Sequence, residues 1–361
     1  MAGTGAISGY VLRLIRESTG RSQTAFGDAI GGVDLSTVQG WESGRRPVAN
    51  MKAGTLIDLR HRLPLLGADK RLIGLLDAAM DADRIVAGIL APPAEATSHP
   101  LAQWVHDRMT THMIAWTLIG RPPPIIAALP VPTRRGASPT APTLSAPDRA
   151  AVFTNLRTAI ESAPSTGAGV LLRRQALYLT SYDRSPGASS WTAQALHSRR
   201  GTLGMRGWSP QWAEARSTAT ALARLGDHTP LIDFIDRAIA DDDRGEAANL
   251  TYWAYWFGAV RQAQPDDGFM GDVGELSSWE PMALLHRLVR GLDEAPTYNN
   301  LYAHSIWSLM TLHPWLPDAA PQAASVLSVR VAGLLDGAEV STRARRELSA
   351  VHRQIGERNS A

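Results

Sequence analysis

Residues 22–47 read SQTAFGDAIGGVDLSTVQGWESGRRP, and this stretch decides how the first part of the chain folds. Ser22 and Asp34 are residue types that cap helices, so each predicts the start of a short helix. Between the two helices stand the glycines at 31–32, which accept the left-handed backbone that a tight turn requires. A basic pair follows the second helix at 45–46. The pattern is that of two short helices joined by a tight turn.

The flanking residues predict two more helices, which complete a small bundle. One is expected over 8–18 with Ser8 as its cap, and the other over 51–63. The helix that begins after Asp34 is expected to run over 35–43. Apolar residues recur in these segments at the spacing of one helix face. Those expected to face a common core are Val11, Leu12, Ile15, Phe26, Ile30, Val38, Trp41 and Leu63.

Residues 8–63 resemble the lambda-repressor-like helix-turn-helix domain of the XRE family of transcriptional regulators. The resemblance rests on LIRESTGRSQ, on the small residues after Phe26 and on VDLSTVQGWESGRRP, which is similar to the form in actinobacterial members. Two positions depart from the family pattern. The turn carries a doubled glycine at 31–32, and Arg21 stands where the family is normally apolar. Both departures affect the expected geometry between the second and third helices.

The resemblance implies that the third helix enters the major groove of double-stranded DNA and reads base edges there. Gln39 is the strongest candidate, because its amide can form two hydrogen bonds with adenine. The reading positions, with a glycine on the same exposed side, are Leu35, Ser36, Thr37, Gln39 and Gly40. Ser22 and Gln23 are expected to contact phosphates. Arg45 and Arg46 are expected on the DNA backbone or near the minor groove, where they hold the register of the protein without reading sequence.

Several of these positions also have an ordinary structural explanation. Ser22 is a common cap, and Gln39 taken alone would be a solvated side chain. Gly40 fits either a close approach to DNA or a tight contact inside the protein. Trp41 is expected in the core, and Glu42 is expected to be structural because a carboxylate facing DNA would repel phosphate.

The composition is that of a globular protein with a basic N-terminal end. The 361 residues predict two or three units, at roughly 100–200 residues per domain. The formal net charge is only +2, yet residues 1–66 contain eight Lys or Arg against five Asp or Glu. The absence of cysteine excludes disulfides, thiolate zinc sites and cysteine nucleophiles. With neither a secretion signal nor an apolar run that could span a membrane, the protein is expected in the cytoplasm, on the nucleoid when bound to DNA.

Four regions are expected, and all the ordered ones are α-helical. They are a DNA-binding domain at 1–66, a helical extension at 67–119, a linker at 120–147 and a helical domain at 148–361. The extension is expected to hold helices over 69–91 and 100–119, which either lengthen the first domain or pair between two subunits. The linker contains eight prolines among its 28 residues and predicts an extended segment, so the main boundary is placed there.

The last region predicts about ten successive helices, arranged as a repeat-like array or as a globular bundle. They are expected over 148–162, 168–182, 189–199, 210–225, 230–241, 245–263, 281–294, 299–313, 320–336 and 341–357. Five aromatic side chains crowd positions 252–257 and cannot all face one side of a helix. Packing on two sides is the favoured interpretation. The alternative is a groove for a small-molecule or peptide effector, with candidate residues Tyr252, Trp256, Trp279 and Trp307.

Together these patterns predict a sequence-specific transcriptional regulator that binds a palindromic operator as a homodimer and is controlled through its C-terminal domain. The alternative is a helical interaction protein, or a peptide or small-molecule receptor, in which DNA binding is only a tether. The sequence contains no nucleophile–base pair, metal motif or cofactor loop, so neither an enzyme nor a bound cofactor or metal is expected.

Overall fold

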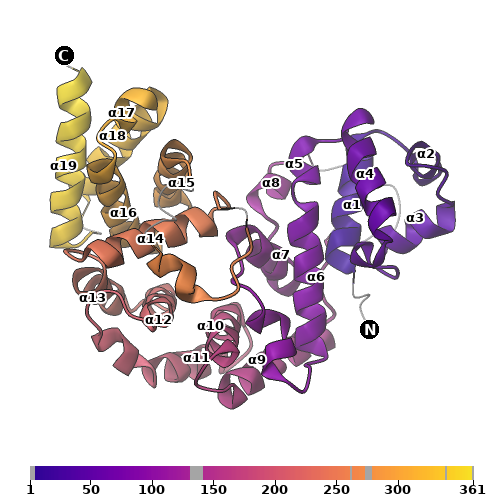
Figure 1. The fold of residues 1–361 in the computed structure, drawn as a ribbon, viewed down its shortest axis with the longest axis horizontal. Helices are drawn as coiled ribbons and strands as arrows, with labels where there is room; N and C mark the ends of the chain where they lie inside the picture. Colours follow the sequence, from indigo (N-terminus) through magenta and orange to yellow (C-terminus); the bar gives the residue numbers. More distant parts are fainter. Residues whose placement is uncertain (1–4, 131–140, 261, 273–278, 338–339, 360–361) are drawn as a thin grey trace. The chain divides into compact units, whose positions relative to one another are not determined.

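The computed structural model describes residues 5–130, 141–260, 262–272, 279–337 and 340–359. All regular elements within these ranges are helices (Figure 1), which confirms the expected all-α class. Among the helices of these ranges, none combines the length and the apolar character needed to cross a bilayer. The contacts divide the chain into unit 1, Met1–Asp183, and unit 2, Arg184–Ala361.

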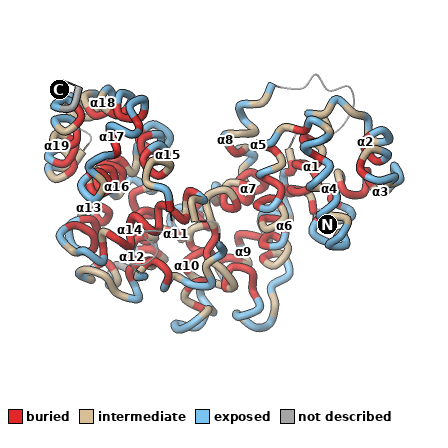
Figure 2. Tube along the Cα trace, turned by 45° about the horizontal axis from the view of Figure 1, so that its top comes forward, coloured by how far each residue is buried: buried red, intermediate tan, exposed pale blue. Residues whose placement is uncertain are grey.

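Unit 1 is built around α6, which contacts α1, α7 and α9. Ala79 and Ala82 on α6 are 0% exposed, and their small side chains let neighbouring helices approach. Figure 2 shows buried and exposed residues alternating along the helices, as expected of elements that each bury one face. The α-helices of unit 1 are α1 (Ala6–Ser18), α2 (Gln23–Ala29), α3 (Leu35–Glu42), α4 (Ala53–Leu65), α5 (Lys70–Ile73), α6 (Leu76–Leu90), α7 (Arg108–Ile119), α8 (Pro124–Ala127), α9 (Ala146–Ser162) and α10 (Ala168–Thr180).

The first helix begins differently from the prediction, because a distant carboxylate binds its N-terminus. α1 starts at Ala6, and Ser8 is buried within the helix instead of capping it. Asp83 on α6 accepts the N–H groups of Ile7 and Ser8, each at 2.9 Å. Burial raises the pKa of Asp83 to about 6, although the hydrogen bonds from Ser8 and Ile7 lower it. A buried carboxylate therefore joins α1 to α6.

The two helices expected in the extension are both interrupted. Residues 69–91 form α5 and α6 with a break between them. Within 100–119 the α-helix begins only at Arg108, because the Asp107 carboxylate accepts the N–H of Thr110 at 2.8 Å and starts a new helix there.

The expected linker, 120–147, is attached to unit 1 at its far end. Residues 131–140 lie outside the described part of the chain. Beyond them, the Thr117 hydroxyl on α7 donates to the Pro142 carbonyl at 2.6 Å, and Leu144 N–H donates to the Thr117 carbonyl at 3.1 Å. These contacts fix the start of α9 against α7.

The boundary between the units follows Asp183 and does not fall at the proline-rich segment. α9 packs on α6, where the Asn155 amide donates to the Ile89 carbonyl at 2.8 Å. α10 is tied to the same unit through Gln175, whose amide donates to the Leu101 carbonyl at 2.9 Å. Proline content is a local property, whereas the boundary depends on where α9 and α10 bury their apolar faces.

In unit 2, helical pairs stack on one another. α15 and α16 form one pair and α18 and α19 another, with α15 against α18 and α16 against α19. α16 also contacts α13 and α14. Pairs that each contact the next are typical of a repeat-like array. The α-helices of unit 2 are α11 (Ala188–His197), α12 (Trp212–Arg224), α13 (Thr229–Ala238), α14 (Asp243–Trp256), α15 (Pro281–Glu294), α16 (Asn299–Leu312), α17 (Leu316–Ala319), α18 (Pro321–Asp336) and α19 (Thr342–Asn359).

Candidate nucleic-acid interface

The candidate site begins with two capped helices, α2 and α3. The Ser22 hydroxyl accepts the N–H of Ala25 at 3.2 Å. The Asp34 carboxylate accepts the N–H of Thr37 at 2.8 Å. Both caps lie where the sequence predicts them, because Ser and Asp supply the oxygen that a helix N-terminus lacks.

The turn between these helices depends on glycine. Gly31 and Gly32 have φ values of 123° and 75°, which residues with a Cβ rarely adopt. The carbonyl of Gly27 accepts the N–H groups of Gly32 and Val33, at 3.1 and 2.9 Å. A Cβ at Gly27 would lie 2.2 Å from the Val33 carbonyl oxygen. The doubled glycine therefore closes a defined turn and holds α3 beside α2.

α3 is seated on the core through its apolar face. Phe26 and Val38 are 0% exposed and Trp41 is 7% exposed, as their helical spacing predicts. A Cβ at Gly9 of α1 would lie 2.2 Å from the Trp41 carbonyl oxygen. Glycine thus permits the close approach of α1 and α3. This packing decides which face of α3 remains exposed.

Glu42 orients one polar side chain of α1 and one of α2 beside α3. It accepts hydrogen bonds from Arg16 Nε at 2.5 Å and from Gln23 Nε2 at 2.7 Å. Gln23 Oε1 in turn accepts Gln39 Nε2 at 3.4 Å. Glu42 therefore has the structural role expected of it, and Gln23 and Gln39, both expected to contact DNA, lie next to each other.

Most of the expected reading residues lie on the exposed face of α3, but Gly40 does not. Gly40 is buried, which corrects its expected exposed placement and agrees with the alternative of a tight contact inside the protein. A Cβ at this position would lie 2.9 Å from Arg46 Cδ, so the Arg46 side chain covers it. Thr37 is half-buried. The exposed members of the set are Leu35, Ser36 and Gln39.

Asp34 accepts hydrogen bonds from two hydroxyl groups at the start of α3. Ser36 Oγ and Thr37 Oγ1 donate to its carboxylate at 2.6 and 2.7 Å. The hydrogen bond from Ser36, followed by those from Thr37, lowers the pKa of Asp34 to about 2, so this carboxylate is ionised at neutral pH. The hydroxyl protons of Ser36 and Thr37 point to Asp34, and their lone pairs remain available to accept hydrogen bonds.

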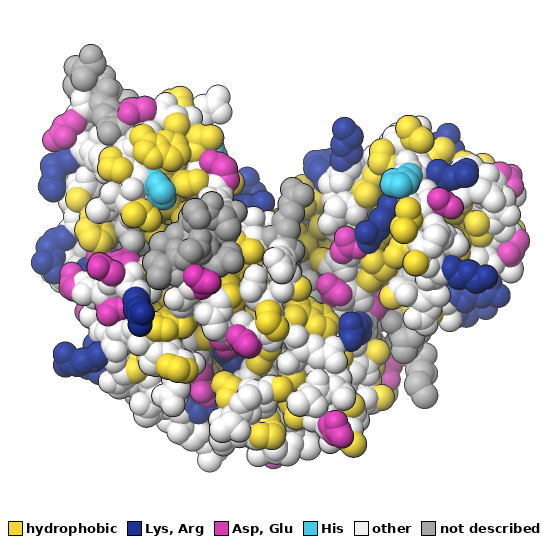
Figure 3. Space-filling view, in the orientation of Figure 1, with side chains coloured by type: hydrophobic (Ala, Val, Ile, Leu, Met, Phe, Trp, Pro, Cys, Tyr) yellow, Lys and Arg dark blue, Asp and Glu magenta, His cyan; other side chains and the backbone are white. Residues whose placement is uncertain are grey.

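Beside α3 lies an open groove of about 690 Å³ that contains three basic side chains and no acidic one. Figure 3 shows dark blue Lys and Arg side chains and magenta Asp and Glu side chains around the end of unit 1 formed by α2 and α3. Asn50 and Lys52 were not anticipated here, although they follow the basic loop directly in the sequence. The groove is lined by Thr37, Trp41, Arg45, Arg46, Pro47, Asn50, Met51, Lys52 and Thr55.

The aromatic residues expected as a ligand or partner site in unit 2 have separate environments. Tyr252 and Trp256 stack with ring centres 6.2 Å apart. Trp279 and Trp307 instead contact histidines of the α16 segment, with ring centres 6.3 and 5.8 Å apart. Thus Tyr252 and Trp256 stack on each other on α14, whereas Trp279 and Trp307 each lie beside a histidine.

α14 is packed on two sides, which is the favoured interpretation of its aromatic residues. Tyr255 contacts Phe269 and Trp253 contacts Tyr302, each with ring centres 4.9 Å apart. The Trp253 indole N–H also donates to the Ser305 hydroxyl at 2.9 Å. These contacts account for two of the aromatic residues through packing alone.

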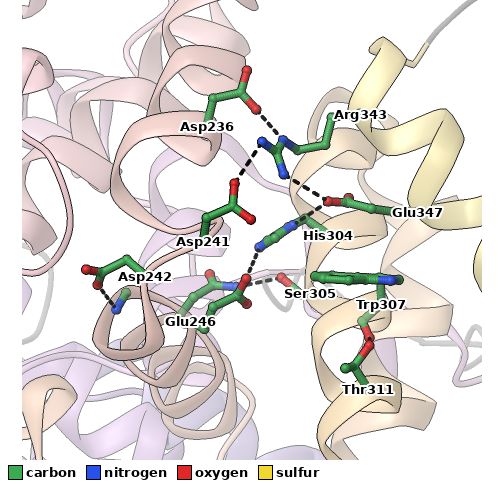
Figure 4. Close-up of polar contacts among 12 residues, drawn as sticks. Asp236, Asp241, Asp242, Glu246, His304, Ser305, Trp307, Thr311, Arg343 and Glu347 are labelled. Carbon is green, nitrogen blue, oxygen red and sulfur yellow. Dashed lines mark hydrogen bonds and ion pairs between the residues drawn. The ribbon is translucent and has the colours of Figure 1, made fainter.

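An ionic cluster with a buried histidine at its centre links four elements of unit 2 (Figure 4). His304 of α16 is 0% exposed and lies between Glu246 Oε1 at 3.1 Å and Glu347 Oε1 at 2.9 Å. Burial lowers the pKa of His304, but hydrogen bonds and charges from the two glutamates outweigh this effect and raise it to about 9. Arg343 of α19 extends the cluster to Asp236 of α13 at 2.5 Å. The sequence carries no local sign of this cluster, because its members are far apart along the chain.

Seven of the nine expected DNA-contact residues are exposed or line the groove in the described structure of unit 1. Of the other two, Gln23 is half-buried and Gly40 is buried beneath Arg46. Within the described ranges, no three His, Asp or Glu side chains are arranged to hold a metal ion. Comparisons of the chain with protein-family models, curated proteins and solved structures find no match.

Proposed function

We propose that this protein is a sequence-specific DNA-binding transcriptional regulator in which α2 and α3 act as a helix-turn-helix and α3 enters the major groove. The observation that supports it most is the exposed polar face of α3 beside a groove with three basic side chains and no acidic one. Base edges are read by polar side chains, and phosphates are held by basic ones.

Each part of this surface has a distinct role in the proposal. Gln39 presents an amide that can pair with adenine, and Leu35 presents an apolar group for a thymine methyl. Ser22 and Gln23 at the start of α2 lie beside the phosphate backbone. Lys52, which lines the groove, supplies positive charge that does not depend on base sequence.

Dimer formation and control through unit 2 complete the proposal. One module of this size buries little surface on DNA, so two copies on symmetry-related half-sites are needed for tight binding. Unit 2 receives the controlling small molecule or peptide, and the stacked helical pairs supply the kind of surface that repeat-like arrays use for binding. Half-site spacing in bound genomic fragments would test the dimer.

The two lysines of the chain offer a matched test of the electrostatic part. Lys52 lines the groove and Lys70 starts α5, outside the groove lining. Lys52→Ala is expected to weaken binding to all DNA sequences and to reduce the slope of log affinity against log salt by about 0.9, because one phosphate contact is lost. The measurement is fluorescence anisotropy of the full chain with labelled DNA at several salt concentrations.

Lys70→Ala is the control and should leave both affinity and slope unchanged. Equal effects of the two substitutions would contradict the placement of the DNA at this groove. Failure of the unmodified chain to bind any genomic fragment would contradict the proposal itself and favour the interaction-protein hypothesis.

A further inference from the structure

We propose that Arg46 reads a guanine in the major groove. Its side chain lies on the surface of α3 over Gly40, which has no side chain of its own to block it. This inference rests on the proposed function. It changes the role expected from the sequence, in which Arg46 holds the DNA backbone without reading bases.

Three contacts fix the Arg46 side chain along α3. Its backbone N–H donates to the Gly40 carbonyl at 3.0 Å. Its stem lies so close to Gly40 that a Cβ there would be 2.9 Å from Arg46 Cδ and 3.2 Å from Cγ. Its Nη1 donates to the Thr37 hydroxyl at 2.6 Å. The side chain therefore runs from the level of Gly40 toward the N-terminus of α3, along the helix surface.

The remaining donors of Arg46 have the geometry that guanine requires. Thr37 binds Nη1, and within the described residues Nε and Nη2 make no hydrogen bond. These two groups form a rigid, parallel pair of N–H donors. Guanine presents the matching pair of acceptors, O6 and N7, in the major groove. The Thr37 hydroxyl donates onward to Asp34 at 2.7 Å, which holds it in the orientation that accepts Arg46.

The neighbouring charge favours a base edge over a phosphate as the partner of Arg46. Asp34 is ionised, and the charge of Arg46 contributes to its lowered pKa, so the two side chains interact. A carboxylate beside the guanidinium repels a phosphate but leaves the paired N–H donors free. Arg45 differs, because its Nε donates to the neutral Ser43 hydroxyl at 3.2 Å. Arg45 is therefore the matched control.

The test is selection of bound sequences from a randomised DNA pool by the full chain, followed by affinity measurements at several salt concentrations. Arg46→Ala should lose the preference for guanine at one position of each half-site, by about ten- to a hundredfold, with little change in salt slope. Arg45→Ala should weaken binding to all DNA sequences alike and reduce the slope of log affinity against log salt. Gly40→Ala, which keeps the arginine but displaces it, should lose the same guanine preference as Arg46→Ala.

Two results would overturn the inference while leaving the proposed function intact. One is an Arg46→Ala variant that behaves like Arg45→Ala, with a uniform loss and a flatter salt slope. The other is a Gly40→Ala variant that keeps the full guanine preference. If the unmodified chain selects no sequence at all, the proposed function fails and this inference fails with it. Circular dichroism of each variant verifies that its helices are retained.

Discussion

Replacing His304 by alanine is expected to destabilise unit 2 by about 3–5 kcal/mol, because the substitution leaves two carboxylates without their shared cation. His304 is 0% exposed. Its ring nitrogens lie 3.1 Å from Glu246 and 2.9 Å from Glu347. The three side chains belong to α16, α14 and α19, so the loss acts on the packing of three helices at once (Figure 4).

Hydrogen exchange of the amides of α16 and α19 in the full chain measures this loss where it occurs. His286→Ala is the matched control, because His286 is exposed on α15 and its Nδ1 lies 2.8 Å from the Met282 carbonyl oxygen of its own helix. Replacing His304 and Glu347 together by leucine should recover part of the loss, since no unpaired charge then remains at that contact. Equal protection in the His304 and His286 variants would contradict the role assigned to the cluster.

The same cluster sets a direction for the effect of pH. The pKa of His304 is raised from 6.5 to about 9 in the folded chain. Its stabilising contribution is therefore fully present below pH 6.5 and is lost as the pH rises through about 9. Burial lowers the pKa of Arg343, but hydrogen bonds and charges from Asp236 and Asp241 outweigh this effect and raise it, so this guanidinium stays charged across the range and the change is assigned to His304. A His304→Gln variant should lack this loss of protection between pH 7 and 10.

Local signals in the sequence predict the helices around the candidate site well. Ser22 and Asp34 each supply an oxygen to an N–H three residues later, so the residue types alone predict where α2 and α3 begin. The burial of Val38 and Trp41 is predicted by their spacing on one face of a helix. These features depend on residues within one or two turns of each other, which is the range that a pattern can report.

Contacts between distant residues explain the predictions that were wrong. Ser8 matches a cap, yet Asp83, which follows it by 75 residues, takes that role. Gly40 matches an exposed position, yet the loop returns Arg46 across it. The proline-rich segment matches a boundary, yet Gln175 beyond it binds back into unit 1. In each case the deciding partner comes from another element, so no local pattern predicts it.

The candidate DNA-binding surface shows the same division between local and distant contacts. Gln39 could be chosen from its place on the third helix, and it is exposed as expected. Asn50 and Lys52 line the groove only because the loop and the start of α4 fold back beside α3. A search of the residues directly after the basic loop would have found them, since they continue the same segment.

The stability of unit 1 is expected to fall as the pH rises from about 4 to about 7, because of Asp83. Its folded pKa of about 6 lies above the ordinary 3.8. For a carboxyl group raised in this way, the stabilising contribution is present below pH 3.8 and is lost as the pH rises through about 6. The difference between these two pKa values corresponds to about 3 kcal/mol in the free energy of unfolding. This direction is opposite to that of an ordinary paired carboxylate.

Asp83→Asn isolates this contribution, because subtracting the variant from the unmodified chain removes the effect of the other titrating groups. The measurement is hydrogen exchange of α1 amides at several pH values, referenced to the intrinsic rate at each pH. Asp77→Asn, an exposed carboxylate on the same helix, serves as the control. A difference between unmodified chain and Asp83→Asn that stays flat with pH would show that the carboxylate is not held in a buried site. Asp83 accepts the N–H groups at the N-terminus of α1, and α1 contacts both α3 and α6, so the amides of α1 should report this change.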